Sequence, residues 1–177
     1  MSNVNLSLSL GTWVALLGAV LPSCSTDETR PHLNAVCFDP PEADPRPGAT
    51  TGIHVVSTDG HRLTLIRLSE SVTGLDAPLL VSRTDVERIL RACEEASKAM
   101  GKAMGKGKGK RSSMPSHGVL RGERGGKLSF TCSAGSCPAD APGPGSPLAM
   151  LAIVPSIVPV DATVFPPWRQ VVPNPIP

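Results

Sequence analysis

Five cysteines and four histidines are the side chains of this sequence best suited to metal binding, disulfide formation or nucleophilic chemistry. Cys132 and Cys137 have the spacing C-x4-C, and neither a histidine nor a second cysteine pair lies near them in the sequence. A structural zinc site usually needs four ligands, and an odd, scattered set of cysteines is a poor disulfide framework. We therefore predict no metal site and interpret Cys132 and Cys137 as unrelated thiols.

Other patterns that could support catalysis are incomplete. Residues 101–109 are rich in glycine but lack the G-x-x-x-x-G-K-[ST] order of a phosphate-binding loop. Asp59 and His61 could form an acid–base pair, yet a tight hairpin turn explains them better. The histidines show neither a known metal-ligand spacing nor an evident nucleophile partner; they are His32, His54, His61 and His117. We predict that the chain is not an enzyme and requires no cofactor.

The composition indicates one folded module with an aliphatic core. The chain has 177 residues, of which 40% are hydrophobic and only 3% aromatic, with no tyrosine. This length suits a single domain. The net charge of +2 is small, whereas a dedicated nucleic-acid binder usually carries a much larger basic excess. Any contact with a polyanion must therefore come from local clusters of basic residues.

Alternating apolar residues predict a group of strands in the first half of the chain. Asp59-Gly60 is a strong tight-turn signal, because glycine tolerates positive φ without steric cost. It separates two strand-like runs, which predicts a β-hairpin. The expected strands span residues 32–38, 53–58, 61–68 and 78–81, with a loop over residues 39–51. Cys37 lies in the first of these strands, and we expect it to be buried as a small hydrophobe.

A helix is predicted to follow over residues 84–99. Ser82 and Asp85 form a capping pattern at its start, and Cys93 lies on its apolar face, where we expect burial. Strand character returns over residues 119–132, with a turn at Gly125-Gly126. Residues 148–164 are aliphatic but contain Pro155 and Pro159, which predicts short edge strands or bulged segments.

Two inserts of biased composition interrupt this pattern. Residues 98–117 are rich in lysine and glycine, and like charges and glycine both oppose helix formation. Residues 134–147 are rich in proline and glycine. We expect both inserts to be disordered, within a single domain spanning residues 5–177.

The apolar run over residues 12–21 has two interpretations. Followed by Cys24, it is similar to a secretory signal with a lipoprotein-type cleavage site, although the preceding segment lacks the expected Lys or Arg. The run is too short to span a membrane. Alternatively it is an internal helix, because one helical face carries Trp13, Leu16, Leu17 and Val20. We favour the internal helix and keep the exported interpretation as the alternative.

One turn between two predicted strands has the sequence Thr58-Asp59-Gly60-His61-Arg62-Leu63. It resembles a turn in the middle domain of the bacterial replicative sliding clamp, the β subunit of DNA polymerase III. Residues 30–38, 78–93 and 165–173 resemble further parts of that domain in the same order. The resemblance implies an α+β fold in which two helices pack on two small antiparallel sheets. Clamps of this family form rings of six such domains, whereas this chain has room for one.

The resemblance also implies a groove that binds short peptides of DNA polymerases and clamp loaders. Gln170 departs from the arginine usual in the family, and the neighbouring domain that completes the groove is missing. Without the resemblance, Arg62 and His61 would be interpreted as a structural hairpin end, with Arg62 paired locally and His61 capping the turn. The implied groove residues are Leu33, Thr58, Gly60, His61, Arg62, Leu63, Pro166 and Val171.

Contact with double-stranded DNA is less well supported by the residues. A helix that lines the pore of a clamp should offer basic side chains to phosphates, yet residues 10–22 contain no charge. Arg88 and Arg91 lie among glutamates, which favours an ordinary solvated face. The candidates for DNA contact are Arg88, Arg91, Lys102, Lys106, Lys108, Lys110 and Arg111.

These observations predict a sliding-clamp-like binding module that acts in DNA replication or repair in the cytoplasm and tethers polymerases or other clamp-binding partners to DNA. We expect no membrane partner. The module would work as a homo-oligomeric ring or as a monomeric decoy that competes with a host clamp for partners. The alternatives are an exported lipoprotein or secreted domain anchored at Cys24, and a degenerate clamp fragment without activity.

Overall fold

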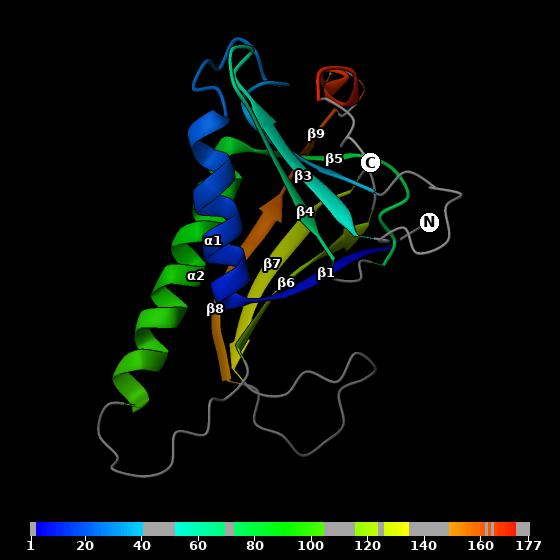
Figure 1. Cartoon of the computed structure of the whole chain (residues 1–177). Helices are drawn as coiled ribbons and strands as arrows, with labels where there is room; N and C mark the ends of the chain where they lie inside the picture. Colours follow the sequence, from blue (N-terminus) through cyan, green and yellow to red (C-terminus); the bar gives the residue numbers. More distant parts are fainter. Residues whose placement is uncertain are drawn as a thin grey trace.

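The computed structural model describes residues 3–40, 52–69, 73–104, 116–123, 126–134, 149–161, 163 and 165–172. Two antiparallel sheets and two helices make up this part of the chain, as Figure 1 shows. The predicted α+β class and the predicted pair of small sheets are therefore confirmed. Residues 105–115 and 135–147 of the two inserts lie outside the described residues, whereas residues 98–104 are helical and residues 116, 117 and 134 lie in strands, so the predicted disorder is wrong for these positions.

The first sheet has the strand order β1-β6-β7-β8. The strands are β1 (Asn3–Ser9), β6 (Ser116–Glu123), β7 (Leu128–Ala134) and β8 (Ala149–Ile157). The sequence analysis missed β1, although its buried Val4, Leu6 and Leu8 alternate with polar residues as a half-buried strand requires. β8 is an edge strand with two register shifts against β7, which confirms the expectation of edge or bulged segments.

The second sheet has the strand order β4-β3-β2-β5-β9. Its strands are β2 (Ala35–Asp39), β3 (Ile53–Thr58), β4 (Leu63–Leu68), β5 (Leu79–Ser82) and β9 (Pro159–Val160). β3 and β4 form the predicted hairpin, in which Thr58 pairs with Leu63 across a turn where Gly60 has a φ of +93°. A side chain at Gly60 would be strained, so the turn depends on glycine there.

Two helices cover the same side of both sheets (Figure 1). Helix α1 (Leu10–Val20) continues into a short 3-10 turn, η1 (Leu21–Ser23). The Ser9 hydroxyl caps α1 by accepting a hydrogen bond from the Thr12 amide at 3.0 Å. Since Trp13, Leu16, Leu17 and Val20 are all buried, the internal-helix interpretation is confirmed.

Helix α2 runs from Arg83 to Met104, so the prediction that it ends at residue 99 was wrong. Alanine, methionine and lysine are strong helix formers and outweigh the single glycine of residues 98–104. Among the described residues, neither helix is long and apolar enough to cross a membrane.

The structure does not support anchoring at Cys24. This residue follows η1 and is only 3% exposed, and its thiol donates a hydrogen bond to the Leu33 carbonyl at 3.6 Å. Burial raises the pKa of the Cys24 thiol to about 11. Cleavage before Cys24 would also remove β1 and α1, whose apolar side chains belong to the main core.

The main core lies between the helices and the two sheets, and Trp13 of α1 is at its centre. The Trp13 ring packs edge-on against Phe130 of β7, with ring centroids 5.2 Å apart. It also packs against Phe38 of β2, with the two ring planes tilted relative to each other. Its indole Nε1–H donates to the Gly118 carbonyl of β6 at 2.8 Å. Trp13 therefore joins α1 to both sheets without leaving a buried donor unpaired.

Gly118 and Gly18 give a matched pair of alanine substitutions. A Cβ at Gly118 would lie 2.5 Å from Phe130 Cζ and 2.6 Å from Trp13 Cδ1, whereas one at Gly18 of α1 would meet nothing within 4 Å. We expect Gly118→Ala to lower the free energy of unfolding by about 1–3 kcal/mol through overpacking. Gly18→Ala should raise it by about 0.5–1 kcal/mol through helix propensity. Urea unfolding measures both, and a neutral Gly118→Ala would contradict this packing.

Candidate peptide-binding site

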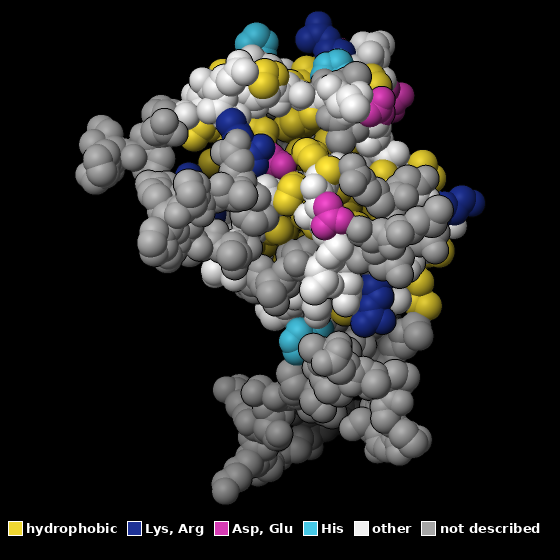
Figure 2. Space-filling model, turned by 90° about the vertical axis from the view of Figure 1, so that its right-hand side faces the viewer, with side chains coloured by type: hydrophobic (Ala, Val, Ile, Leu, Met, Phe, Trp, Pro, Cys, Tyr) yellow, Lys and Arg dark blue, Asp and Glu magenta, His cyan; other side chains and the backbone are white. Residues whose placement is uncertain are grey.

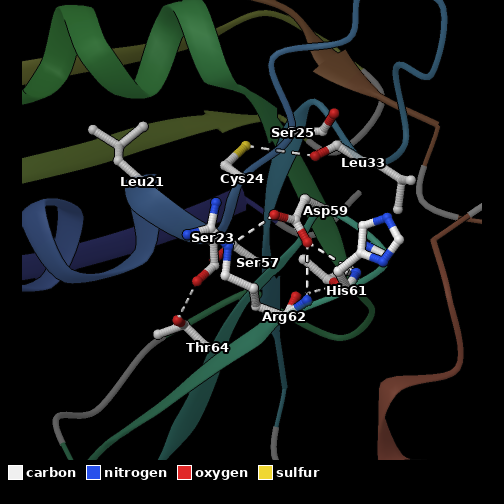
Figure 3. Close-up of polar contacts among 12 residues, drawn as sticks. Leu21, Ser23, Cys24, Ser25, Leu33, Ser57, Asp59, His61, Arg62 and Thr64 are labelled. Carbon is white, nitrogen blue, oxygen red and sulfur yellow. Dashed lines mark hydrogen bonds and ion pairs between the residues drawn. The ribbon is translucent and has the colours of Figure 1, made fainter.

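The tip of the β3–β4 hairpin is held by two side chains of its own turn (Figure 3). The Asp59 carboxylate accepts hydrogen bonds from the backbone amides of His61 and Arg62, each at 2.9 Å, and from Arg62 Nε at 2.9 Å. The Thr58 hydroxyl donates to the Arg62 carbonyl at 2.7 Å and accepts from the Gly60 amide at 3.1 Å. The tip is therefore rigid, and Arg62 pairs locally as the structural interpretation of this turn expected.

These hydrogen bonds lower the pKa of Asp59. The backbone amides of Arg62 and His61 contribute most, followed by the Arg62 side chain, because all of them favour the ionised carboxylate. The turn thus carries a fixed negative charge beside the exposed side chains of His61 and Arg62.

Next to its tip, the hairpin is tied to the end of α1 and to η1. The Ser57 hydroxyl donates to the Val20 carbonyl at 2.7 Å, and the Ser23 and Thr64 hydroxyls are hydrogen-bonded at 2.7 Å. In Figure 3, Ser23 of η1 and Thr64 of β4 face each other across this contact, so η1 lies next to the hairpin. The tip therefore has a fixed position relative to the helices.

The segment of residues 165–172, which we call the C-terminal segment, is fastened to the second sheet by Asp39 at the end of β2. Asp39 is 4% exposed. Its Oδ2 accepts a hydrogen bond from Trp168 Nε1 at 2.9 Å and forms an ion pair with Arg169 Nη1 at 2.6 Å. Arg169 also donates to the Pro40 carbonyl at 3.1 Å. The Arg169 guanidinium carbon lies 4.7 Å from the centroid of the Trp168 ring, which adds a cation–π contact.

The C-terminal segment packs on an apolar surface of the second sheet, on the side that faces away from the helices. We call it the outer-face cluster. Figure 2 views the molecule from that side and shows hydrophobic side chains gathered in the upper middle of the face. Its buried members are Ala35, Cys37, Val56, Leu80 and Trp168, and its partly exposed members are Leu63, Leu65, Val160, Phe165 and Val172.

A pocket of about 420 Å³ lies where the C-terminal segment meets β2. This volume falls within the range of about 300–1,000 Å³ that is typical of sites for small ligands. The walls combine an aromatic and proline-rich segment with one buried ion pair. The lining residues are Cys37, Asp39, Pro78, Phe165, Pro166, Pro167, Trp168, Arg169 and Gln170.

The predicted groove residues fall into two groups. Thr58, Gly60, His61, Arg62 and Leu63 form the hairpin tip, and Pro166 and Val171 belong to the C-terminal segment; Leu33 is buried just before β2. The outer-face cluster connects the groups, since Leu63 packs in the same cluster as Trp168. Val171 is 71% exposed, and Pro166 is the one predicted residue that lines the pocket.

Sequence reasoning missed Asp39, Phe165, Trp168 and Arg169 as parts of the site. One signal was available: Trp168 is one of only two tryptophans and lies in a proline-rich tail, where a large aromatic side chain needs a packing partner. No signal identified Asp39, because its partners lie 129 and 130 positions further along the chain.

The DNA-contact candidates that the structure describes are engaged with neighbouring groups. Arg88 pairs with Asp85 and donates to the Pro155 carbonyl at 3.3 Å, and Arg91 lies 3.7 Å from a Glu87 oxygen. Lys102 lies within α2, but its side chain is not described. The other candidates, Lys106, Lys108, Lys110 and Arg111, lie outside the described residues. DNA contact therefore stays a prediction.

Comparisons with known proteins identify the fold as that of one domain of a bacterial sliding clamp. A clamp from Bartonella birtlesii bound to griselimycin is 20% identical, with a TM-score of 0.62 over 98% of this chain and 36% of that one. A sliding clamp from Caulobacter crescentus is 18% identical, with a TM-score of 0.61 over 97% of this chain and 35% of that one. The DNA polymerase III β subunit from Thermotoga maritima is 16% identical, with a TM-score of 0.58 over 98% of this chain and 35% of that one. No protein-family model and no curated protein sequence matches.

These similarities confirm the clamp-type fold that the sequence resemblance implied. The chain spans about a third of the length of the clamps it matches. At these identities the comparison establishes the fold and leaves the groove residues as predictions.

Asp39→Ala tests how the C-terminal segment is held. The change leaves the Trp168 indole N–H and Arg169 without their shared partner, which costs about 1–3 kcal/mol for a buried donor. Solvent relieves part of the charge loss, since the Arg169 side chain is 33% exposed. We expect a lower free energy of unfolding and a red shift of tryptophan emission as Trp168 becomes hydrated. Glu95→Ala, which removes an exposed carboxylate of α2, is the control, and unchanged emission in Asp39→Ala would contradict the arrangement.

Asp59→Asn tests the charge in the hairpin turn through its pH dependence. The folded-state pKa of Asp59 lies below the ordinary unfolded value of about 3.9. The carboxylate therefore stabilises the fold above that pH, and its contribution is lost as the pH falls through the folded pKa. We expect Asp59→Asn to lower the urea midpoint at neutral pH, with a difference from wild type that shrinks below about pH 4. Asp76→Asn, at an exposed carboxylate, is the control; a difference independent of pH would contradict this role.

Proposed function

We propose that the chain is a clamp-type binding module that acts in DNA replication or repair in the cytoplasm. It captures short linear peptides of DNA polymerases or clamp loaders between the hairpin tip and the C-terminal segment. The observation that supports this most is the outer-face cluster, whose partly exposed Leu63 adjoins the rigid turn and which also includes Phe165 and Val172 of the C-terminal segment. Such a surface offers a peptide apolar contacts that are already in place.

The chemistry of the site favours binding over catalysis. Leu63, Leu65, Phe165 and Val172 can be covered by apolar side chains of a ligand, and burial of their surface would drive association. The backbone near Gly60 is open to close approach, since a Cβ there would meet nothing within 4 Å. In the described ranges, no group of three or more His, Cys, Asp or Glu side chains could hold a metal ion.

The proposal has two forms, which differ in the number of copies. Several copies could associate into a ring, or a monomer could bind clamp partners and compete with a host clamp for them. Light scattering distinguishes the two, because a monomer has a mass of 18.4 kDa and a ring of single-domain chains a multiple of it. A monomer that binds no peptide would contradict both forms and leave the fold alone.

Leu63→Ala tests the groove directly. We expect the dissociation constant for a fluorescein-labelled clamp-binding peptide of a bacterial replicative polymerase to rise about tenfold, which corresponds to about 1.4 kcal/mol. The physical reason is the loss of apolar surface that the ligand covers. Fluorescence polarisation of the peptide measures the constant, with thermal unfolding to verify that the variant is folded.

Ile153→Ala is the matched control for Leu63→Ala. Ile153 is an aliphatic residue of similar size that is 52% exposed, but it lies on β8 of the first sheet, away from the groove. Its substitution should leave peptide affinity unchanged. Equal losses of peptide affinity in the two variants, or a loss of affinity only in Ile153→Ala, would show that the peptide binds at another surface.

A further inference from the structure

Two cysteine sulfurs from different elements meet inside the main core. Cys93 of α2 and Cys132 of β7 are 39 positions apart in the chain, and their Sγ atoms are 3.9 Å apart. Both residues have an exposed fraction of 0%. The sequence suggested no partner for Cys132 and considered it only beside Cys137, which lies outside the described residues; the structure gives it Cys93 as a neighbour.

The other described thiols have different surroundings. Cys37 lies in the outer-face cluster on the opposite side of the second sheet, where burial raises the pKa of its thiol to about 12. Cys24 donates its S–H to a backbone carbonyl. In the described part of the chain, the contact between Cys93 and Cys132 is thus the place where one thiol is positioned to react with another.

We propose that Cys93 and Cys132 are a redox-sensitive pair, which a peroxide oxidises to an intramolecular disulfide joining α2 to β7. The ordinary S–S bond length is about 2.05 Å, so the two sulfurs must approach by roughly 1.9 Å from their separation of 3.9 Å. Rotation of the two side chains about their Cα–Cβ bonds brings sulfurs closer without breaking either element. Because both thiols are buried, a small oxidant reaches them during local opening of the core.

The reaction proceeds in two steps. The hydrogen bond from Cys93 lowers the pKa of Cys132, whereas the same hydrogen bond and burial raise the pKa of Cys93. The Cys132 thiolate therefore attacks one peroxide oxygen: an S–O bond forms, the O–O bond breaks, and the leaving hydroxide takes up a proton to become water. The Cys93 sulfur then attacks the Cys132 sulfenic sulfur: the S–S bond forms, the S–O bond breaks, and the Cys93 proton leaves with the hydroxyl as water. The two thiols lose two hydrogens in total, and hydrogen peroxide is reduced to two waters.

The disulfide would change the stability of the fold more than its shape. Its bond closes a loop that contains the end of α2, the insert, β6 and the first part of β7. A cross-link between distant positions restricts the unfolded chain and thereby stabilises the folded one. Oxidation is therefore expected to raise the midpoint of thermal unfolding by several degrees, and a reductant should reverse the rise.

The test uses the full chain treated with hydrogen peroxide under native conditions. After quenching, unfolding and alkylation of free thiols, peptide mapping by mass spectrometry should find the Cys93 and Cys132 peptides cross-linked, with Cys24 and Cys37 alkylated. The cross-link should disappear on reduction, together with the rise in unfolding midpoint. Alkylation of both Cys93 and Cys132, their conversion to sulfinic acids, or a cross-link from Cys132 to Cys137 would overturn the proposal.

Two variants complete the test. Cys93→Ala should leave Cys132 unable to form this cross-link, and peroxide should no longer raise the unfolding midpoint. Cys37→Ala removes a buried thiol that lies outside the pair, and its response to peroxide should equal that of the wild type. A rise of similar size in Cys93→Ala would show that another reaction is responsible. The peptide map of the wild-type protein decides the question without either variant, even if one of them folds poorly.

Discussion

A single buried carboxylate determines where the last part of the candidate site lies. Asp39 ends β2 with 4% of its side chain exposed, and a buried charge is costly unless it is paired and hydrogen-bonded. Trp168 and Arg169 supply both requirements from the opposite end of the chain. The C-terminal segment is thereby held against the second sheet, where it lines the pocket and contributes Phe165, Trp168 and Val172 to the outer-face cluster.

The hairpin tip is fixed by a separate set of polar contacts, so the apolar surface has a rigid border on two sides. Asp59 and Thr58 hold the turn, while Ser57 and Ser23 tie the hairpin to the end of α1. A peptide that binds here would meet groups whose positions are already set, which reduces the entropy lost on binding. The arrangement uses the clamp-type fold as a scaffold for recognition, with the helices and the main core on the other side of the sheet.

Local signals in the sequence predicted the elements that depend on neighbouring residues. The Asp59-Gly60 turn, the apolar face of α1 and the capping pattern before α2 are all short-range features, and the structure contains each of them. β1 was not predicted, because the segment before the apolar run was considered only as the start of a secretory signal. Asp39 with Trp168, and Cys93 with Cys132, could not be predicted, because each pairing depends on how distant strands and helices pack.

The central claim is that one clamp-type domain can bind a peptide without a neighbouring domain. The most direct measurement is a titration of the ¹⁵N-labelled chain with an unlabelled clamp-binding peptide, followed by two-dimensional ¹H–¹⁵N NMR. We expect the amide resonances of residues 58–63, Phe165 and residues 168–172 and the indole resonance of Trp168 to shift, while those of α1 stay in place. Unchanged spectra at saturating peptide, or shifts confined to the helices, would contradict it.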